Sequence, residues 1–115
     1  MRYWIYLIPI AVIGYLLWSR RSASATDLRA LLDRSAQIVD VRTNAEFKSN
    51  ADTRAINIPL DQLEGRVKEL DRNRPILVCC ASGSRSGVAV SILKRAGFTE
   101  VANLGSWRRI HSLLS

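Results

Sequence analysis

The 115-residue sequence is poor in the side chains that build disulfide frameworks and metal centres. It has two cysteines, Cys79 and Cys80, and one histidine, His111. Adjacent cysteines cannot form an ordinary structural disulfide, and three such residues are too few for a closed four-ligand metal site. We therefore expect one small domain that needs neither a metal nor another cofactor.

Acidic residues are absent before Asp27, and charge of either sign is absent from residues 3–18. The formal net charge is +7, but three arginines flank the uncharged run, which leaves +4 for the rest of the chain. In that remainder, acidic and basic side chains alternate. Interleaved signs indicate a solvated surface rather than a nucleic-acid-binding stripe, so we expect no nucleic-acid partner.

The uncharged run at residues 3–18 is apolar and carries aromatic residues at both of its ends. Such a distribution is typical of the aromatic belts at the two interfaces of a membrane. We therefore expect residues 1–21 to be a single-pass transmembrane anchor, with the membrane as a partner. More basic residues follow the run than precede it, which favours a domain on the cytoplasmic face over the extracytoplasmic side.

A cleaved signal peptide is the alternative interpretation of the same segment. Arg2 supplies a basic start, and Ala23-Ser24-Ala25 has the small-residue spacing of a cleavage site. Arg20 and Arg21 argue against cleavage, because charge is unusual between the apolar core of a signal peptide and its cleavage site. Of the two interpretations we favour the uncleaved anchor.

After a linker at residues 22–25, which is not expected to pack, helices and strands alternate. Thr26 is expected to cap a helix that runs through Leu28, Leu31 and Leu32. The other expected helices are residues 44–48, 61–70, 86–96 and 107–114, and the expected strands are 37–41, 55–58, 76–79 and 100–103. This order predicts that residues 26–115 form an α/β domain with a mainly parallel central sheet flanked by helices.

The loop between Cys80 and Arg85 leaves a predicted buried strand and enters a predicted helix, a position where α/β folds place their chemistry. The N-terminus of that helix offers unpaired backbone N–H groups and partial positive charge. Gly83 allows the backbone to curl those groups around one point, and Arg85 adds a guanidinium suited to oxyanions. Each effect favours a thiolate at Cys80 beside a site for a small anion.

From residue 37 to about residue 110, the sequence resembles the rhodanese family, and its compact single-domain members look most similar. The motifs that carry the resemblance are Ile38-Val39-Asp40-Val41-Arg42 with Glu46-Phe47, Ala55-Ile56-Asn57-Ile58-Pro59-Leu60, Pro75-Ile76-Leu77-Val78-Cys79-Cys80, Ser82-Gly83-Ser84-Arg85-Ser86, Ala96-Gly97-Phe98 and Asn103-Leu104-Gly105. Their order and spacing make the resemblance specific, although each motif alone is weak.

The resemblance implies a rhodanese-like fold and a sulfurtransferase activity. In the family, a loop cysteine accepts a sulfane sulfur from thiosulfate or a related anionic donor, becomes a persulfide, and passes the sulfur to a thiol or cyanide. Carried over, Cys80 is the persulfide-forming residue and Arg85 binds the donor anion. The surrounding cradle is formed by the backbone of Ala81, Ser82, Gly83, Ser84 and Ser86.

The chain departs from the family pattern at two places. Where family members usually have Gly-His-Ile-Pro-Gly, this chain has Asn50-Ala51-Asp52-Thr53-Arg54, so we expect a rebuilt wall of the site. After Gly105, the segment keeps one glycine where two or three are common. The first departure bears on which substrate the site accepts.

Counting from Cys79 instead of Cys80 places five residues before Arg85, which is the spacing of cysteine phosphatases and related arsenate reductases. In that pattern a glycine follows the cysteine by three residues, and only Cys80 has one there, Gly83. This favours Cys80 and a sulfurtransferase. A phosphatase-like enzyme that uses Cys79 and a non-catalytic module that relays sulfur or binds a partner remain as alternatives.

Several other conspicuous residues are interpreted as structural. We expect Asp40, Arg42 and Glu46 to form an ion pair and a turn cap. Trp107 is expected in the core or a lid, and His111 on a surface helix without a role.

Overall fold

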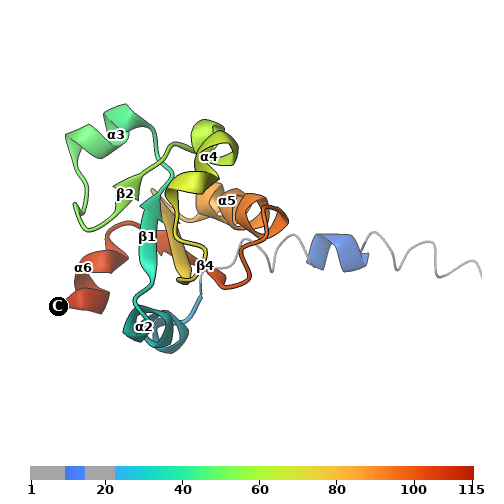
Figure 1. Cartoon of the computed structure of the whole chain (residues 1–115). Helices are drawn as coiled ribbons and strands as arrows, with labels where there is room; N and C mark the ends of the chain where they lie inside the picture. The colour runs from blue at the N-terminus through green and yellow to red at the C-terminus, as the bar shows by residue number, and fades with distance from the viewer. Residues whose placement is uncertain (1–9, 15–22) are drawn as a thin grey trace, which may run out of the picture.

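The computed structural model describes residues 10–14 and 23–115 of the chain (Figure 1). Residues 10–14 are helical. Within the described ranges, no helix has the length and apolar character needed to cross a membrane. The predicted anchor at residues 1–21 lies mostly outside the described residues, so membrane anchoring and the signal-peptide alternative both stay predictions.

A four-stranded parallel sheet with the order β2-β1-β3-β4 forms the centre of the domain. The strands are β1 (Gln37–Asp40), β2 (Ile56–Asn57), β3 (Ile76–Cys80) and β4 (Val101–Ser106). All four lie where the sequence predicts them, and the mainly parallel sheet is confirmed. The last strand continues three residues beyond its predicted end, past a shift of register between Val78 and Cys79. Gly105, with a φ of 92°, made that extension hard to predict because glycine is rare in strand interiors.

The helices lie where the sequence predicts them, but several of their ends differ from the prediction, and the last helix begins at Arg109 instead of residue 107. They are α2 (Ala25–Asp33), α3 (Asn44–Ser49), α4 (Leu60–Arg66), the 3₁₀ turn η1 (Val67–Glu69), α5 (Ser84–Arg95) and α6 (Arg109–Leu114). The first helix is capped by Ser24, whose Oγ accepts from the backbone N–H of Asp27, and not by Thr26. The helix predicted at residues 61–70 tightens into η1 after Arg66. Helix α5 begins at Ser84, earlier than predicted, because Gly83 adopts a left-handed conformation just before it.

Successive residues of the central strands face opposite sides of the sheet and divide the core in two. On one side Val39 and Val78 pack with Leu63 of α4 and Leu93 of α5. On the other side Leu77 packs in a second cluster that also contains Leu28 of α2 and Ile110 of α6. Figure 1 shows the two pairs of helices on opposite faces of the sheet. The predicted layers, with helices on both faces, are therefore confirmed.

The described end of the predicted linker packs against the domain, contrary to expectation. The backbone N–H of Ala23 donates to the carbonyl of Asn103 at 2.9 Å, and Arg109 donates to the Ala23 carbonyl at 3.3 Å. Ala23 also contacts the cluster that contains Leu28 and Ile110. Small residues predicted a loose connection, but their size also allows the backbone to lie close to β4.

Candidate active site

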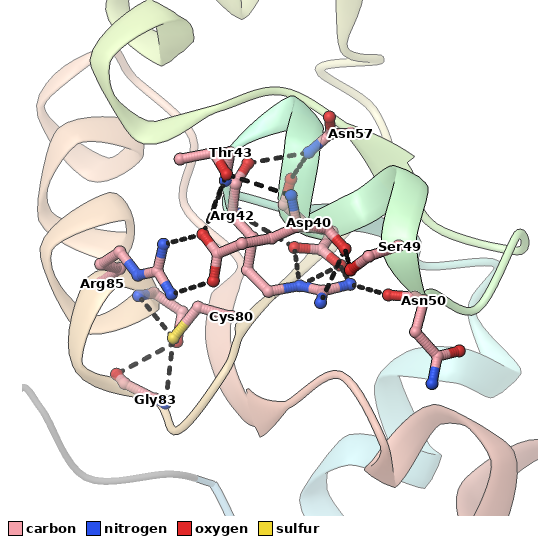
Figure 2. A network of polar contacts seen from close by, with 11 residues as sticks. Asp40, Arg42, Thr43, Ser49, Asn50, Asn57, Cys80, Gly83 and Arg85 are labelled. Carbon is pink, nitrogen blue, oxygen red and sulfur yellow. Dashed lines mark hydrogen bonds and ion pairs between the residues drawn. The ribbon is translucent and has the colours of Figure 1, made fainter.

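The candidate site lies at the carboxyl end of β3, the strand between β1 and β4. Cys80 is the last residue of β3, and Gly83 precedes the first residue of α5. The tight connection requires Gly83, whose φ is 109°. Strand, loop and helix thus bring the N-terminus of α5 over Cys80, as the sequence predicts (Figure 2).

The sulfur of Cys80 is surrounded by hydrogen-bond donors. The backbone N–H groups of Gly83 and Ser86 donate to it at 2.9 and 3.5 Å, and the Ser86 hydroxyl lies at 3.4 Å. Burial by itself raises the pKa of the Cys80 thiol, but donation from the hydroxyl and N–H of Ser86 and from the N–H groups of Gly83 and Ser82 outweighs it. The pKa is therefore lowered below that of a free thiol.

The predicted cradle is contributed unequally by its members. Gly83 and Ser86 are buried and contact the sulfur, whereas Ala81, Ser82 and Ser84 are exposed, although the N–H of Ser82 still acts on the thiol. Cys80 itself is 1% exposed, so its sulfur is shielded from bulk water. A donor must shift part of these surroundings to reach it.

Arg85 lies beside Cys80 and is held by Glu46 of α3 (Figure 2). Its Nη1 and Nη2 donate to the two carboxylate oxygens of Glu46 at 2.6 and 2.9 Å. The hydrogen bond from Arg85, followed by donation from the Thr43 backbone, lowers the pKa of Glu46 to about 2. The positive charge expected at the cradle is thus present but already paired. The pairing of Arg85 with Glu46 is not predicted from the sequence.

Glu46 is fixed by a capping box at the start of α3. The Thr43 Oγ1 accepts from the N–H of Glu46 at 3.2 Å, and the Thr43 N–H donates to Glu46 Oε1 at 3.1 Å. The Thr-x-x-Glu spacing is the sequence signature of this cap, so the turn could have been predicted in detail. Its link to Arg85 could not, because the two residues lie 39 positions apart.

A buried hydrogen-bond network supports the cradle from β4. Asn103 Nδ2 donates to the carbonyl of Gly83 at 2.9 Å, and the Ser86 hydroxyl donates to Asn103 Oδ1 at 2.6 Å. Ser86 is completely buried and Asn103 is 4% exposed. The sequence signals for Asn103 are its place in the Asn103-Leu104-Gly105 motif and at the predicted end of a strand.

Asp40 and Arg42 form the expected ion pair, and it is buried. Arg42 Nη2 donates to Asp40 Oδ2 at 2.8 Å, and the two side chains are 5% and 0% exposed, respectively. Arg42 also donates to the carbonyl of Asn50 at 2.9 Å, while Asn57 donates to the Asp40 and Arg42 carbonyls. Figure 2 shows this group next to Thr43, which caps α3. These contacts support the interpretation that the pair is structural.

Trp107 is half-buried and lies between two guanidinium groups. The Cζ atoms of Arg42 and Arg108 are each 4.7 Å from its ring centroid, a distance at which both form cation–π contacts. Its backbone N–H donates to the carbonyl of Cys80 at 2.9 Å. Trp107 therefore joins the end of β4 to the end of β3. His111, the other residue of this segment that the sequence makes conspicuous, is exposed on α6 as expected.

Cys79 faces the opposite side of the sheet from Cys80. It is completely buried in the cluster with Leu28 and Ile110. Burial first, and the charge of Asp40 second, raise the pKa of its thiol. A buried neutral thiol is a poor nucleophile, which argues against the phosphatase-like alternative.

Residues 50–54, where the sequence predicts a rebuilt wall of the site, form a turn organised by Asp52. Arg54 donates to both carboxylate oxygens of Asp52, and the N–H of Ala55 donates to the Asp52 carbonyl at 3.1 Å. Among residues 10–14 and 23–115, no group of three His, Cys, Asp or Glu residues is placed to hold a metal ion.

Comparison with known proteins places most of the chain in one family. A sequence model described as the Rhodanese-like domain matches residues 24–112. A structure of a rhodanese-related protein from Thermoplasma volcanium has a TM-score of 0.63 and 33% identity, covering 82% of this chain and 90% of that one.

Curated relatives show the same similarity at the level of sequence. The uncharacterized protein YqhL of Bacillus subtilis is 41% identical over 71 residues, covering 62% of this chain and 56% of that protein. The putative sulfur carrier protein YrkF of the same species is 38% identical, covering 63% of this chain and 39% of that protein. Thiosulfate sulfurtransferase PspE of Escherichia coli is 35% identical, covering 63% and 71%. The matched part therefore spans little more than half, or less, of the first two relatives.

Proposed function

The chain belongs to the rhodanese-like domain family, and from that premise we propose that it is a sulfurtransferase that carries a sulfane sulfur on Cys80. The observation that carries the proposal is the set of donors from Gly83 and Ser86 that converges on the Cys80 sulfur. Such a set stabilises a thiolate and, after sulfur transfer, the negative charge of a persulfide. Similarity to a protein named thiosulfate sulfurtransferase supports thiosulfate or a related anion as the donor.

The proposed reaction has two displacement steps. The Cys80 thiolate attacks the outer sulfur of thiosulfate, the S–S bond of the donor breaks, and sulfite leaves with the electron pair. A thiolate or cyanide acceptor then attacks the outer sulfur of the Cys80 persulfide. The acceptor becomes a persulfide or thiocyanate, and Cys80 returns as a thiolate, so no external oxidant or reductant is needed.

In this scheme Arg85 binds the donor anion and Gly83 and Ser86 hold the transferred sulfur. Arg85 Nη1 and Nη2 face Glu46, so a donor either uses another edge of the guanidinium or displaces the carboxylate. The exposed backbone of Ala81, Ser82 and Ser84 forms the rim that a donor meets first. A small dianion fits this arrangement better than a bulky substrate, because Cys80 is almost fully enclosed.

The test is mass spectrometry of the intact protein after exposure to thiosulfate. Persulfide formation adds about 32 Da, which cyanide should remove as thiocyanate. A Cys80→Ser variant should gain nothing, whereas Cys79→Ala should behave as the wild type. Absence of the added mass on Cys80, or its persistence in Cys80→Ser, would contradict the proposal.

A sulfur-relay module is the second candidate, favoured by the similarity to a putative sulfur carrier and by the pairing of Arg85 with Glu46. Such a module would take sulfur from a protein persulfide and not from a free anion. Persulfidation of Cys80 by a cysteine-persulfide donor, with none by thiosulfate, would distinguish it from the enzyme.

Hydrolysis of an aryl phosphate that is abolished by Cys79→Ser alone would instead indicate the phosphatase-like alternative.

We further propose that residues 3–18 anchor the chain in a membrane, with the domain on the cytoplasmic face. The described turn at residues 10–14 supports this proposal because it exposes Ile10 and Ile13. The full chain should then stay with membranes in alkaline carbonate, and Ile10→Lys with Ile13→Lys should release it. Loss of the first residues in the intact mass would instead indicate a cleaved signal peptide.

A further inference from the structure

Asn103 connects β4 to the loop that surrounds the Cys80 sulfur. Its Nδ2 donates to the Gly83 carbonyl at 2.9 Å, and its Oδ1 accepts from the Gly105 N–H at 2.9 Å. These two contacts define which side of the amide carries the oxygen. That oxygen also accepts the 2.6 Å hydrogen bond from the Ser86 hydroxyl.

The Ser86 hydroxyl has one proton and three neighbours that can accept it. They are Asn103 Oδ1 at 2.6 Å, the Gly83 carbonyl at 3.1 Å and the Cys80 sulfur at 3.4 Å. The Gly83 carbonyl already accepts from Asn103 Nδ2 and from the Gly87 N–H, so it is a weaker acceptor for the hydroxyl than Asn103 Oδ1 is. While Cys80 is a neutral thiol, the hydroxyl donates mainly to Asn103 Oδ1, and a small rotation lets it donate to a thiolate at Cys80 instead.

The backbone of Gly83 is held at both its N–H and its carbonyl. Its N–H donates to the Cys80 sulfur at 2.9 Å, while its carbonyl accepts from Asn103 and from the Gly87 N–H at 3.0 Å. The N–H and the carbonyl belong to the two peptide groups on either side of the Gly83 Cα. Fixing the carbonyl therefore limits how far this glycine, which has no side chain to restrict it, can turn its N–H away from the sulfur.

We propose that Asn103 is a positioning residue for the reactive sulfur, holding the Gly83 peptide and the Ser86 hydroxyl so that both stabilise the Cys80 thiolate. It does not touch the substrate. The inference rests on the proposed function only in that sulfur transfer gives the thiolate a purpose. The thiolate and its donors can be measured without sulfur transfer. Without Asn103, the Ser86 hydroxyl would donate to the Gly83 carbonyl in place of the sulfur, and the Gly83 N–H would be held less firmly beside the sulfur.

A test must separate the contacts of Asn103 from the effect of the charged groups around the sulfur. They are Arg85 from α5, its partner Glu46 from α3, and the buried Asp40–Arg42 pair at the end of β1. Asn103→Asp keeps the shape and one acceptor oxygen, removes the donor to Gly83 and adds a negative charge. Asn57→Asp is the matched control, since Asn57 Nδ2 also donates to two backbone carbonyls at the same end of the sheet.

The experiment follows thiolate absorbance at 240 nm against pH in the full chain, with the signal of Cys80→Ser subtracted. Asn103→Asp should move the titration midpoint upward by about one unit, a tenfold loss of thiolate below both midpoints. Asn57→Asp should move it much less. Ser86→Ala should also raise the midpoint, and its effect should not add to that of Asn103→Asp because the two residues share one network.

A midpoint in Asn103→Asp that equals that of Asn57→Asp, or full additivity with Ser86→Ala, would overturn the proposal. Because Asn103→Asp also adds a charge near the sulfur, Asn103→Leu, which adds none, is titrated in every case. It should raise the midpoint as well, and an unchanged midpoint in folded Asn103→Leu overturns the proposal. A normal titration pattern without any sulfur transfer would refute the sulfurtransferase function and leave the role of Asn103 standing.

Discussion

Arg85 and Glu46 join α5 to α3 through two hydrogen bonds of 2.6 and 2.9 Å at the edge of the sulfur cradle. The two side chains are 36% and 38% exposed, so water reaches the pair. A donor anion meets a guanidinium whose charge is already balanced by a carboxylate. Glu46 therefore belongs to the description of the site as much as Arg85 does.

Replacing Glu46 by glutamine should accelerate persulfide formation from thiosulfate. Glutamine can still serve in the Thr43 capping box and accept from Arg85, so the guanidinium keeps its place but gains net positive charge. We expect the second-order rate constant for persulfide formation to rise about two- to fivefold, the range of one exposed ion pair. Glu69→Gln, which removes the carboxylate of the Arg66 pair, is the matched control and should change nothing.

The same substitution should change how stability depends on acid. The pKa of Glu46 is about 2 in the folded protein and 4.5 in its ordinary state, so between these values the unfolded chain binds more protons. The stabilisation is present above pH 4.5 and is lost as pH falls toward 2. Urea unfolding between those limits should show a shallower loss of stability in Glu46→Gln than in the wild type. Equal slopes would mean that the pair does not persist in solution.

The two cysteines should differ in both reactivity and structural importance. Cys79→Ala should form the Cys80 persulfide normally and lose about 1 kcal/mol of stability, because it removes a buried sulfur from the core. Cys80→Ala should fold and form no persulfide. Intact mass after thiosulfate exposure and urea unfolding provide the two readouts. Loss of persulfidation in a folded Cys79→Ala protein would contradict this assignment of roles.

Much of the fold could be predicted because the apolar pattern is local. The strand at Ile76–Cys80 is a continuous apolar run, and its period of two puts Cys79 and Cys80 on opposite faces. The glycine at position 83 likewise indicated the turn before α5. These features depend on residues close together in sequence.

The parts that sequence reasoning missed depend on contacts between distant segments. Nothing near Arg85 indicates that Glu46 pairs with it, and nothing near Ser86 indicates that its hydroxyl donates to Asn103. Ala23 looked like linker because small residues are typical of linkers, yet its backbone pairs with β4. Such partners follow from the order of the strands and the crossing of the helices, which a single sequence leaves open.

Two Asp-x-Arg pairs in the same domain allow a direct comparison of buried and exposed charge. Asp40 and Arg42 are 0% and 5% exposed, whereas Asp52 and Arg54 are 13% and 44% exposed. Asp40→Asn leaves the Arg42 guanidinium buried without its counter-charge, and the contacts with Asn50 and Trp107 prevent it from swinging into water.

We therefore expect Asp40→Asn to lower the free energy of unfolding by about 3–5 kcal/mol. Asp52→Asn should cost only about 0–1 kcal/mol, because Arg54 can remain hydrated. Urea unfolding of the two variants at neutral pH measures both values on one scale. A similar, small loss of stability in both variants would show that water reaches Arg42 in solution. In that case the Asp40–Arg42 pair would not hold the ends of β1 and α3 beside the cradle.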